Sequence, residues 1–154
     1  MTPGRLAPVR LALAQIDTRV GDIEGNVAKI RDYTGRARDA GAELVLFPEL
    51  AVTGYPPEDL LLKEHFLRRT REALEALAAD TEGIVSLVGF PERSEDVYNS
   101  LAVLAGGEVK AIYRKTQLPN YGVFDEQRYF QSGDGGAVID LGQARLGLTI
   151  CEDI

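Results

Sequence analysis

Cysteine and histidine are nearly missing from this sequence, with one of each in 154 residues. Cys151 therefore has no partner for an intramolecular disulfide, and no CxxC redox or zinc motif is present. With His65 as the only imidazole, the chain has too few soft ligands to build a zinc site. We expect no metal, and a lone thiol fits a reducing, cytoplasmic compartment.

Runs of basic residues and long hydrophobic stretches are missing too. Because nothing offsets the net charge of −7, neither a nucleic acid nor a membrane is expected as a partner. The apolar stretch near the start is interrupted by Arg10 and closed by Gln15 and Asp17, so it is too short and polar for a signal peptide or a membrane span. With 45% hydrophobic and 27% charged residues, the composition is typical of one globular domain.

Apolar patterning predicts strands that alternate with helices. We expect strands at residues 9–14, 44–47 and 84–90, and a long helix at residues 60–79 with His65 in its middle. Asn26 is expected to cap a further helix, and Gly41 to end it. This half of the chain therefore predicts an α/β fold.

Hairpins dominate the second half of the chain. Residues 98–104 and 109–113 flank Gly106-Gly107, and residues 138–141 and 145–150 flank Gly142, so we expect two antiparallel pairs and a mixed sheet. The last strand runs directly into Cys-Glu-Asp-Ile, without the helix that should cover a buried strand. We therefore expect the sequence to be a fragment, with further elements downstream.

Three reactive residues each follow directly on an apolar strand. Glu49, Lys115 and Cys151 occupy these positions, and the carboxyl ends of strands in α/β sheets gather at one edge, where ligand sites form. A thiol is mostly protonated at neutral pH and needs a base to attack an amide. Glu49 can take the thiol proton and return it to the leaving ammonia, which makes a thioester intermediate possible.

The developing oxyanion of such a reaction needs hydrogen-bond donors. Lys115 and the backbone N–H of Glu152 are the candidates, because both are close in sequence to a strand end. Each residue also has an ordinary interpretation. Cys151 could be a small buried hydrophobe, Glu49 a turn residue or helix cap, and Lys115 a solvated charge.

The sequence segments around these residues favour the catalytic interpretation. The segments FPELAVTGYPPEDLL (47–61), YRKTQLPNYGVFDEQRYF (113–130) and LTICEDI (148–154) resemble the three catalytic motifs of the carbon–nitrogen hydrolase, or nitrilase, superfamily. The loop around the two prolines and the stretch after the lysine are more narrowly similar to the glutaminase domains of glutamine-dependent NAD synthetases. The similarity spans nearly the whole chain from Val9.

This resemblance implies roles for individual residues. Glu49, Lys115 and Cys151 match the family's general base, oxyanion lysine and nucleophile. Tyr121 matches a residue that holds the substrate glutamine, and Glu126 a second glutamate that positions the lysine and the amide.

Phe124 and Tyr55 are expected to wall the same pocket as Tyr121. All three aromatics could instead be ordinary packing residues, and Glu126 a surface acid. The glycine-rich run that begins at Ser132 is interpreted as a plain turn, because no lysine or helix pattern follows it.

The resemblance also implies a fold and partners. The fold is an α/β four-layer α-β-β-α sandwich, which residues 1–154 would contain in truncated form as a carbon–nitrogen hydrolase (glutaminase) domain. L-Glutamine would be hydrolysed here, and the ammonia would pass to a synthetase domain that uses ATP, Mg²⁺ and deamido-NAD and is absent from this chain. The full-length protein is expected to be a homo-oligomer. A stand-alone amidase or carbamoylase, or a non-catalytic domain of the same fold, remains the alternative.

Overall fold

A five-stranded mixed sheet forms the centre of the protein. In the computed structural model, which describes residues 8–154, the strand order is β1-β2-β3-β4-β5. The strands are β1 (Leu11–Leu13), β2 (Leu44–Leu46), β3 (Val85–Arg93), β4 (Val97–Ala105) and β5 (Glu108–Arg114). The first three are parallel, and β4 is antiparallel to both of its neighbours. The expected mixed sheet and its first hairpin are therefore confirmed.

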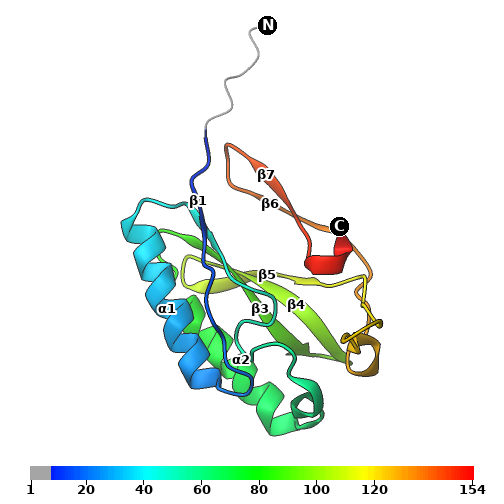
Figure 1. The fold of residues 1–154 in the computed structure, drawn as a ribbon. Helices are drawn as coiled ribbons and strands as arrows, with labels where there is room; N and C mark the ends of the chain where they lie inside the picture. The colour runs from blue at the N-terminus through cyan, green and yellow to red at the C-terminus, as the bar shows by residue number, and fades with distance from the viewer. Residues whose placement is uncertain (1–7) are drawn as a thin grey trace, which may run out of the picture.

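Two helices cover one face of this sheet. Figure 1 shows α1 (Ile23–Asp39) and α2 (Glu64–Ala78) side by side below the strands. Ile30 of α1 and Leu74 of α2 are almost fully buried in one cluster with Val45 of β2 and Val88 of β3. Burial of such aliphatic side chains is the main favourable term in folding, so this layer anchors the sheet.

The predicted start of the first helix was wrong. Asp22 caps α1, since its carboxylate accepts a hydrogen bond from the Gly25 N–H at 2.9 Å. Asn26 lies inside the helix, fully buried, and donates from its side-chain amide to the carbonyl oxygens of Arg19 and Val52. Asp and Asn are equally good caps, so the pattern could not decide between them. Gly41 does lie beyond the helix end, with φ of +78°.

The predicted long helix is divided in two. A short 3₁₀ helix η1 (Glu58–Leu62) precedes α2, and Lys63 between them is extended at φ −101° and ψ 106°. His65 consequently lies in the first turn of α2, exposed, and not in the middle of a helix. Leu62 at the end of η1 is apolar but 69% exposed, so an apolar residue that belongs to no buried face hides the break in the sequence pattern.

A second hairpin covers the other face of the sheet. Strands β6 (Ala137–Asp140) and β7 (Arg145–Leu148) pair antiparallel, as expected, and pack above β5 in Figure 1. Leu148 and Ile150 lie in one buried cluster with Leu87 and Tyr113 of the central sheet. Residues 8–154 thus supply a helical layer, a sheet and part of a second sheet, the first layers of the α-β-β-α sandwich. No helix among these residues is long and apolar enough to cross a membrane.

Strand direction brings three strand ends to one edge of the molecule. β5 is antiparallel to β4, which is antiparallel to β3, so β2, β3 and β5 all run the same way. The turn that follows β2 is held close against β3 at Gly89. A Cβ atom on Gly89 would lie 2.5 Å from the backbone nitrogen of Leu50, so only glycine allows this approach. The backbone of β3 therefore fixes the turn that carries Glu49.

Candidate active site

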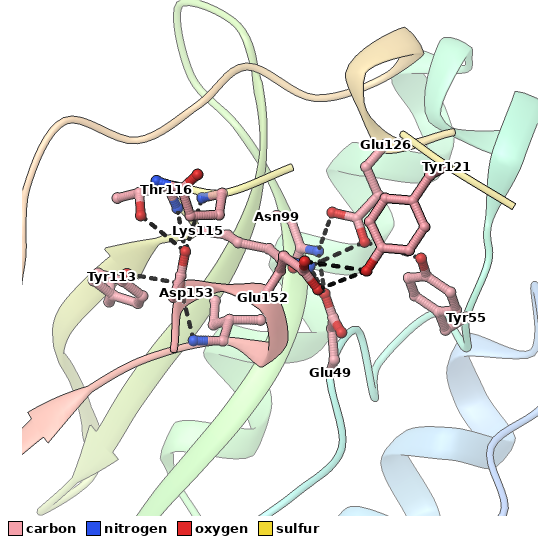
Figure 2. A network of polar contacts seen from close by, with 12 residues as sticks. Glu49, Tyr55, Asn99, Tyr113, Lys115, Thr116, Tyr121, Glu126, Glu152 and Asp153 are labelled. Atoms are coloured by element: carbon pink, nitrogen blue, oxygen red, sulfur yellow. Dashed lines mark hydrogen bonds and ion pairs between the residues drawn. The ribbon is translucent and has the colours of Figure 1, made fainter. Parts of the chain in front are cut away.

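A buried ammonium group lies between two carboxylates at this edge. Lys115 is fully buried, and its Nζ donates to Glu49 Oε1 at 2.7 Å and to Glu126 Oε1 at 3.0 Å. Figure 2 shows the cluster. Lys115 directly follows β5, while Glu126 begins the short 3₁₀ helix η2 (Glu126–Arg128). Two carboxylates against one ammonium leave the cluster with a formal charge of −1.

The lysine keeps its proton in this environment. Burial alone would lower the pKa of Lys115, but the hydrogen bonds and charges of Glu49 and Glu126 outweigh it, and the pKa is raised. Lys115 is therefore a hydrogen-bond donor at neutral pH and not a base. An ammonium has three N–H groups, of which the carboxylates take two, so one remains for a further acceptor.

The thiol of Cys151 lies next to this cluster, on a sharp turn. Cys151 follows β7, begins the one-turn helix η3 (Cys151–Asp153) and has φ of +46°, a left-handed conformation that is strained for any residue but glycine. The residue is exposed. Cys151 and Glu49 line one cavity of about 250 Å³, whose other walls come from β3, β4 and β7.

The surroundings of Cys151 keep its thiol protonated. Burial and the negative charge of Glu49 raise the pKa of Cys151, and the positive charge of Lys115 offsets them only in part. The thiol therefore needs a base to become a nucleophile at neutral pH. Lys115 thus contacts Glu49, and Glu49 shares a cavity with Cys151, while the catalytic roles of the three residues stay a prediction.

The remaining predicted site residues surround the same place. Tyr121, more than half exposed, donates from its hydroxyl to the Glu152 carboxylate at 3.0 Å and 3.1 Å. The Phe124 ring lies between two tyrosines, with centroids 5.6 Å from Tyr121 and 6.5 Å from Tyr55. Tyr55 donates to Glu126 at 2.9 Å. Burial and Glu126 raise the pKa of Tyr55 well above its ordinary value, so its hydroxyl stays protonated.

Two polar residues of this region were not predicted from the sequence. Asn99 on β4 donates from Nδ2 to Glu49 Oε1 at 2.7 Å, and at 3.4 Å to Glu126 Oε2. A polar Asn-Ser pair inside an otherwise apolar strand was the available signal. Asp153 has no such signal, because an acid two residues after a cysteine belongs to no general pattern.

Asp153 ties the cysteine turn to the lysine strand. Its Oδ1 accepts hydrogen bonds from the Thr116 N–H, the Thr116 hydroxyl and the Gln117 N–H at 2.8–2.9 Å. Its Oδ2 accepts from the Tyr113 hydroxyl at 2.7 Å and the Ile150 N–H at 3.0 Å. In the sequence, Tyr113, Thr116 and Gln117 lie on either side of Lys115, and Ile150 precedes Cys151. Figure 2 shows Asp153 beside Tyr113 and Thr116. One carboxylate therefore sets the distance between the two reactive groups.

Asp153→Asn is expected to destabilise the protein and to misplace Cys151. Partial burial would raise the pKa of Asp153, but the hydrogen bonds from Gln117, Tyr113 and Ile150 outweigh it, and the pKa is lowered. Losing these charged hydrogen bonds should cost about 1.5–3 kcal/mol of unfolding free energy at pH 7, and a displaced thiol should react on the order of tenfold or more slowly. Urea unfolding and Cys151 alkylation measure the two effects.

The pH dependence of this loss has a definite sign. Because the folded-state pKa of Asp153 is depressed, its contribution is fully present above the ordinary value of 3.8 and disappears as the pH falls through the folded value. Wild type and Asp153→Asn should therefore converge in stability at acid pH. Asp96→Asn is the control, since Asp96 is exposed and accepts from the N–H of its neighbour Val97. Equal losses in both variants would contradict the proposed link.

Residues 8–154 show neither a phosphate-binding loop nor a cluster of metal ligands. The glycine-rich run from Ser132 leads into strand β6, so its backbone does not open a helix N-terminus as a phosphate-binding loop does. Within residues 8–154, no group of three or more acidic, His or Cys side chains could hold a metal ion.

Sequence comparison shows the family of this protein. Residues 10–154 match the carbon-nitrogen hydrolase family, and the chain belongs to it. The chain is 47% identical over 148 residues to glutamine-dependent NAD(+) synthetase of Thermotoga maritima and 47% over 150 residues to that of Xanthomonas campestris. Each alignment covers 95% of this chain, which spans 26% and 27% of those relatives' lengths.

Solved structures show the same relationship. Glutamine-dependent NAD+ synthetase of Acinetobacter baumannii, in complex with ADP, has a TM-score of 0.88 at 41% identity over 93% of this chain and 27% of its own. A variant of an amidase from Nesterenkonia has a TM-score of 0.80 at 32% identity over 94% of this chain and 56% of its own. That amidase carries the acetamide moiety of fluoroacetamide on its active site cysteine.

Proposed function

We propose that this domain hydrolyses the side-chain amide of glutamine through a thioester on Cys151. One observation carries the proposal. A protonated Lys115 lies between two carboxylates, one of which, Glu49, shares a cavity with the Cys151 thiol. This arrangement supplies a nucleophile, a base and an oxyanion donor for attack on a carbonyl carbon.

The reaction proceeds in two halves. Glu49 takes the proton as the S–H bond of Cys151 breaks, and the sulfur attacks the amide carbon. The remaining N–H of Lys115 and the backbone N–H of Glu152 donate to the oxyanion. Glu49 returns the proton to the nitrogen as the C–N bond breaks, which releases ammonia and leaves a thioester. Water, deprotonated by Glu49, then hydrolyses the thioester and frees the thiol.

Glutamine is favoured over simpler amides by the residues beside the thiol. Glu152 directly follows Cys151, is exposed, and accepts from the Tyr121 hydroxyl. Its carboxylate can bind the α-ammonium group of an amino acid whose side-chain amide reaches Cys151. Phe124 packs between Tyr121 and Tyr55, and we propose that these rings contact the aliphatic part of the glutamine, although none of them lines the cavity of Glu49 and Cys151.

We further propose that the ammonia serves the amidation of deamido-NAD to NAD by an ATP- and Mg²⁺-dependent synthetase domain. The names of the relatives that are 47% identical to this chain support this destination. A second candidate is an amidase that releases ammonia to solvent, which the 32% identity to the Nesterenkonia amidase favours.

Alkylation of Cys151 distinguishes a glutamine-specific site from a general amidase site. Relative to reaction with a free thiol, a chloroketone analogue of glutamine should be accelerated at Cys151 much more than fluoroacetamide is, and free glutamine should protect the thiol from both. Glu152→Gln should lose the preference for the glutamine analogue, on the order of tenfold or more, because a charged hydrogen bond is removed. Its reaction with fluoroacetamide should change little. Mass spectrometry of the modified chain measures each rate. Equal accelerations of both reagents in the unmodified protein would support the general amidase instead.

A further inference from the structure

Asn99 occupies an unusual position for a neutral residue. It lies on β4, is 1% exposed, and its Nδ2 contacts both carboxylates of the lysine cluster. Its backbone carbonyl oxygen accepts from the Lys115 N–H at 2.8 Å, which places the strand end beside the same cluster. The residue therefore touches Glu49, Glu126 and the backbone of Lys115 at once.

The orientation of the Asn99 amide is fixed by the carboxylates. Its Oδ1 is buried and has no hydrogen-bond partner among residues 8–154. Buried acceptors are normally paired, so an unpaired one marks a group whose arrangement is set by another need. Ionised carboxylates accept only, and turning the amide round would place Oδ1 against them. The Nδ2 contacts therefore dictate this geometry.

Both donors to Glu49 use the same oxygen. Lys115 Nζ and Asn99 Nδ2 each lie 2.7 Å from Oε1. None of the hydrogen bonds described for residues 8–154 uses Oε2 of Glu49. The carboxylate is held at one oxygen, and the other keeps its lone pairs for a proton.

We infer that Asn99 is a positioning residue that fixes Oε1 of Glu49, so that Oε2 is the atom that takes the proton from Cys151. The inference rests on the proposed function, because it concerns the base of that reaction. A hydrogen bond donated to a carboxylate favours its ionised form, so replacing Asn99 removes a contact that favours the active base. The charged and titratable groups around Glu49 are Lys115, Glu126, Tyr55, Cys151 and Glu152.

The pH dependence of glutamine hydrolysis tests this inference. Ammonia release from glutamine should fall on the acid side, where the base of the reaction is protonated. In Asn99→Leu this acid limb of the pH profile should move to higher pH by about one unit. At a fixed pH on the acid side, the rate of Asn99→Leu should then be about tenfold lower than that of the unmodified protein. In Asn99→Asp a third carboxylate favours proton uptake further, so the limb should move more than in Asn99→Leu.

Asn26→Asp is the matched control. Asn26 is equally buried and also donates from Nδ2 to two acceptors, but these are backbone carbonyl oxygens of Arg19 and Val52. The Asn26→Asp variant should have a lower urea midpoint of unfolding, but the acid limb of its pH profile should stay in place. An acid limb that stays in place in folded Asn99→Leu would overturn the inference, and Asn99→Ser serves if Asn99→Leu does not fold. An unmodified protein that releases no ammonia from glutamine would instead defeat the proposed function.

Discussion

Replacing Cys151 by alanine should abolish glutamine use and spare ammonia use. In a protein that joins this domain to a synthetase, Cys151→Ala should make no NAD from glutamine, ATP and deamido-NAD, while added ammonium salt restores synthesis. Cys151 is the only cysteine of these 154 residues, so this domain has no second thiol to form the thioester. The expected loss exceeds about a thousandfold, because the covalent route disappears entirely. Chromatographic measurement of NAD with each nitrogen source checks the result.

The fold of the variant provides the control for this experiment. Cys151 is exposed, so its truncation creates no cavity, and the urea midpoint of Cys151→Ala should match that of the unmodified protein. Cys151→Gly should be somewhat more stable than Cys151→Ala, because φ of +46° costs glycine little. Undiminished use of glutamine by the alanine variant would refute the nucleophile. Loss of ammonium-driven synthesis as well would show damage beyond this site.

The order and type of the elements followed from local patterns. The apolar run at residues 44–47 and the Gly106-Gly107 turn each predicted a strand or hairpin that the structure contains, because period and turn chemistry are local properties. The residues at which helices begin were harder to predict from the sequence. Asp22 and Asn26 are equally good caps in isolation, and only the burial of Asn26 against Val52 decides between them.

Local sequence patterns likewise located only part of the site. Glu49, Lys115 and Cys151 could be found because each follows a strand, Lys115 directly and the other two after two further residues. The common direction of β2 and β5 carries Glu49 and Lys115 to one edge, whereas Cys151 comes from the second sheet. Asn99 and Asp153 act through partners far away in the sequence, 50 residues to Glu49 and 36 to Gln117. Such pairings depend on sheet register and on the path of the chain after β7, which no local pattern encodes.

Lys115→Met should remove most of the reactivity of Cys151 and much of the protein's stability. The methionine fills a similar volume but leaves Glu49 and Glu126 as neighbouring carboxylates without a counter-charge. Breaking a buried ion pair on one side costs about 3–5 kcal/mol of unfolding free energy. Loss of the oxyanion donor should slow glutamine hydrolysis by about 10²–10³-fold. Urea unfolding and ammonia release from glutamine measure the two losses separately.

The stability loss in Lys115→Met should depend on pH in a defined direction. Two carboxylates in contact favour the uptake of one proton, so the folded variant binds more protons than its unfolded chain near neutral pH. Its stability should therefore rise as the pH is lowered from 8 towards about 5. The unmodified protein does not share this trend from Lys115, whose raised pKa keeps the lysine charged across that whole range.

Lys110→Met separates the effect of burial from the effect of losing a positive charge. Lys110 pairs with Glu108 at 2.7 Å on the surface, where its side chain is 50% exposed. An exposed pair of this kind contributes about 0–1 kcal/mol, so Lys110→Met should keep its stability, its pH profile and its glutaminase rate. If Lys115→Met lost no more stability than Lys110→Met and still released ammonia at an unchanged rate, Lys115 would be neither the counter-charge nor the oxyanion donor. The buried cluster would then be a structural feature, and the carbonyl oxygen would have to be stabilised by backbone donors alone.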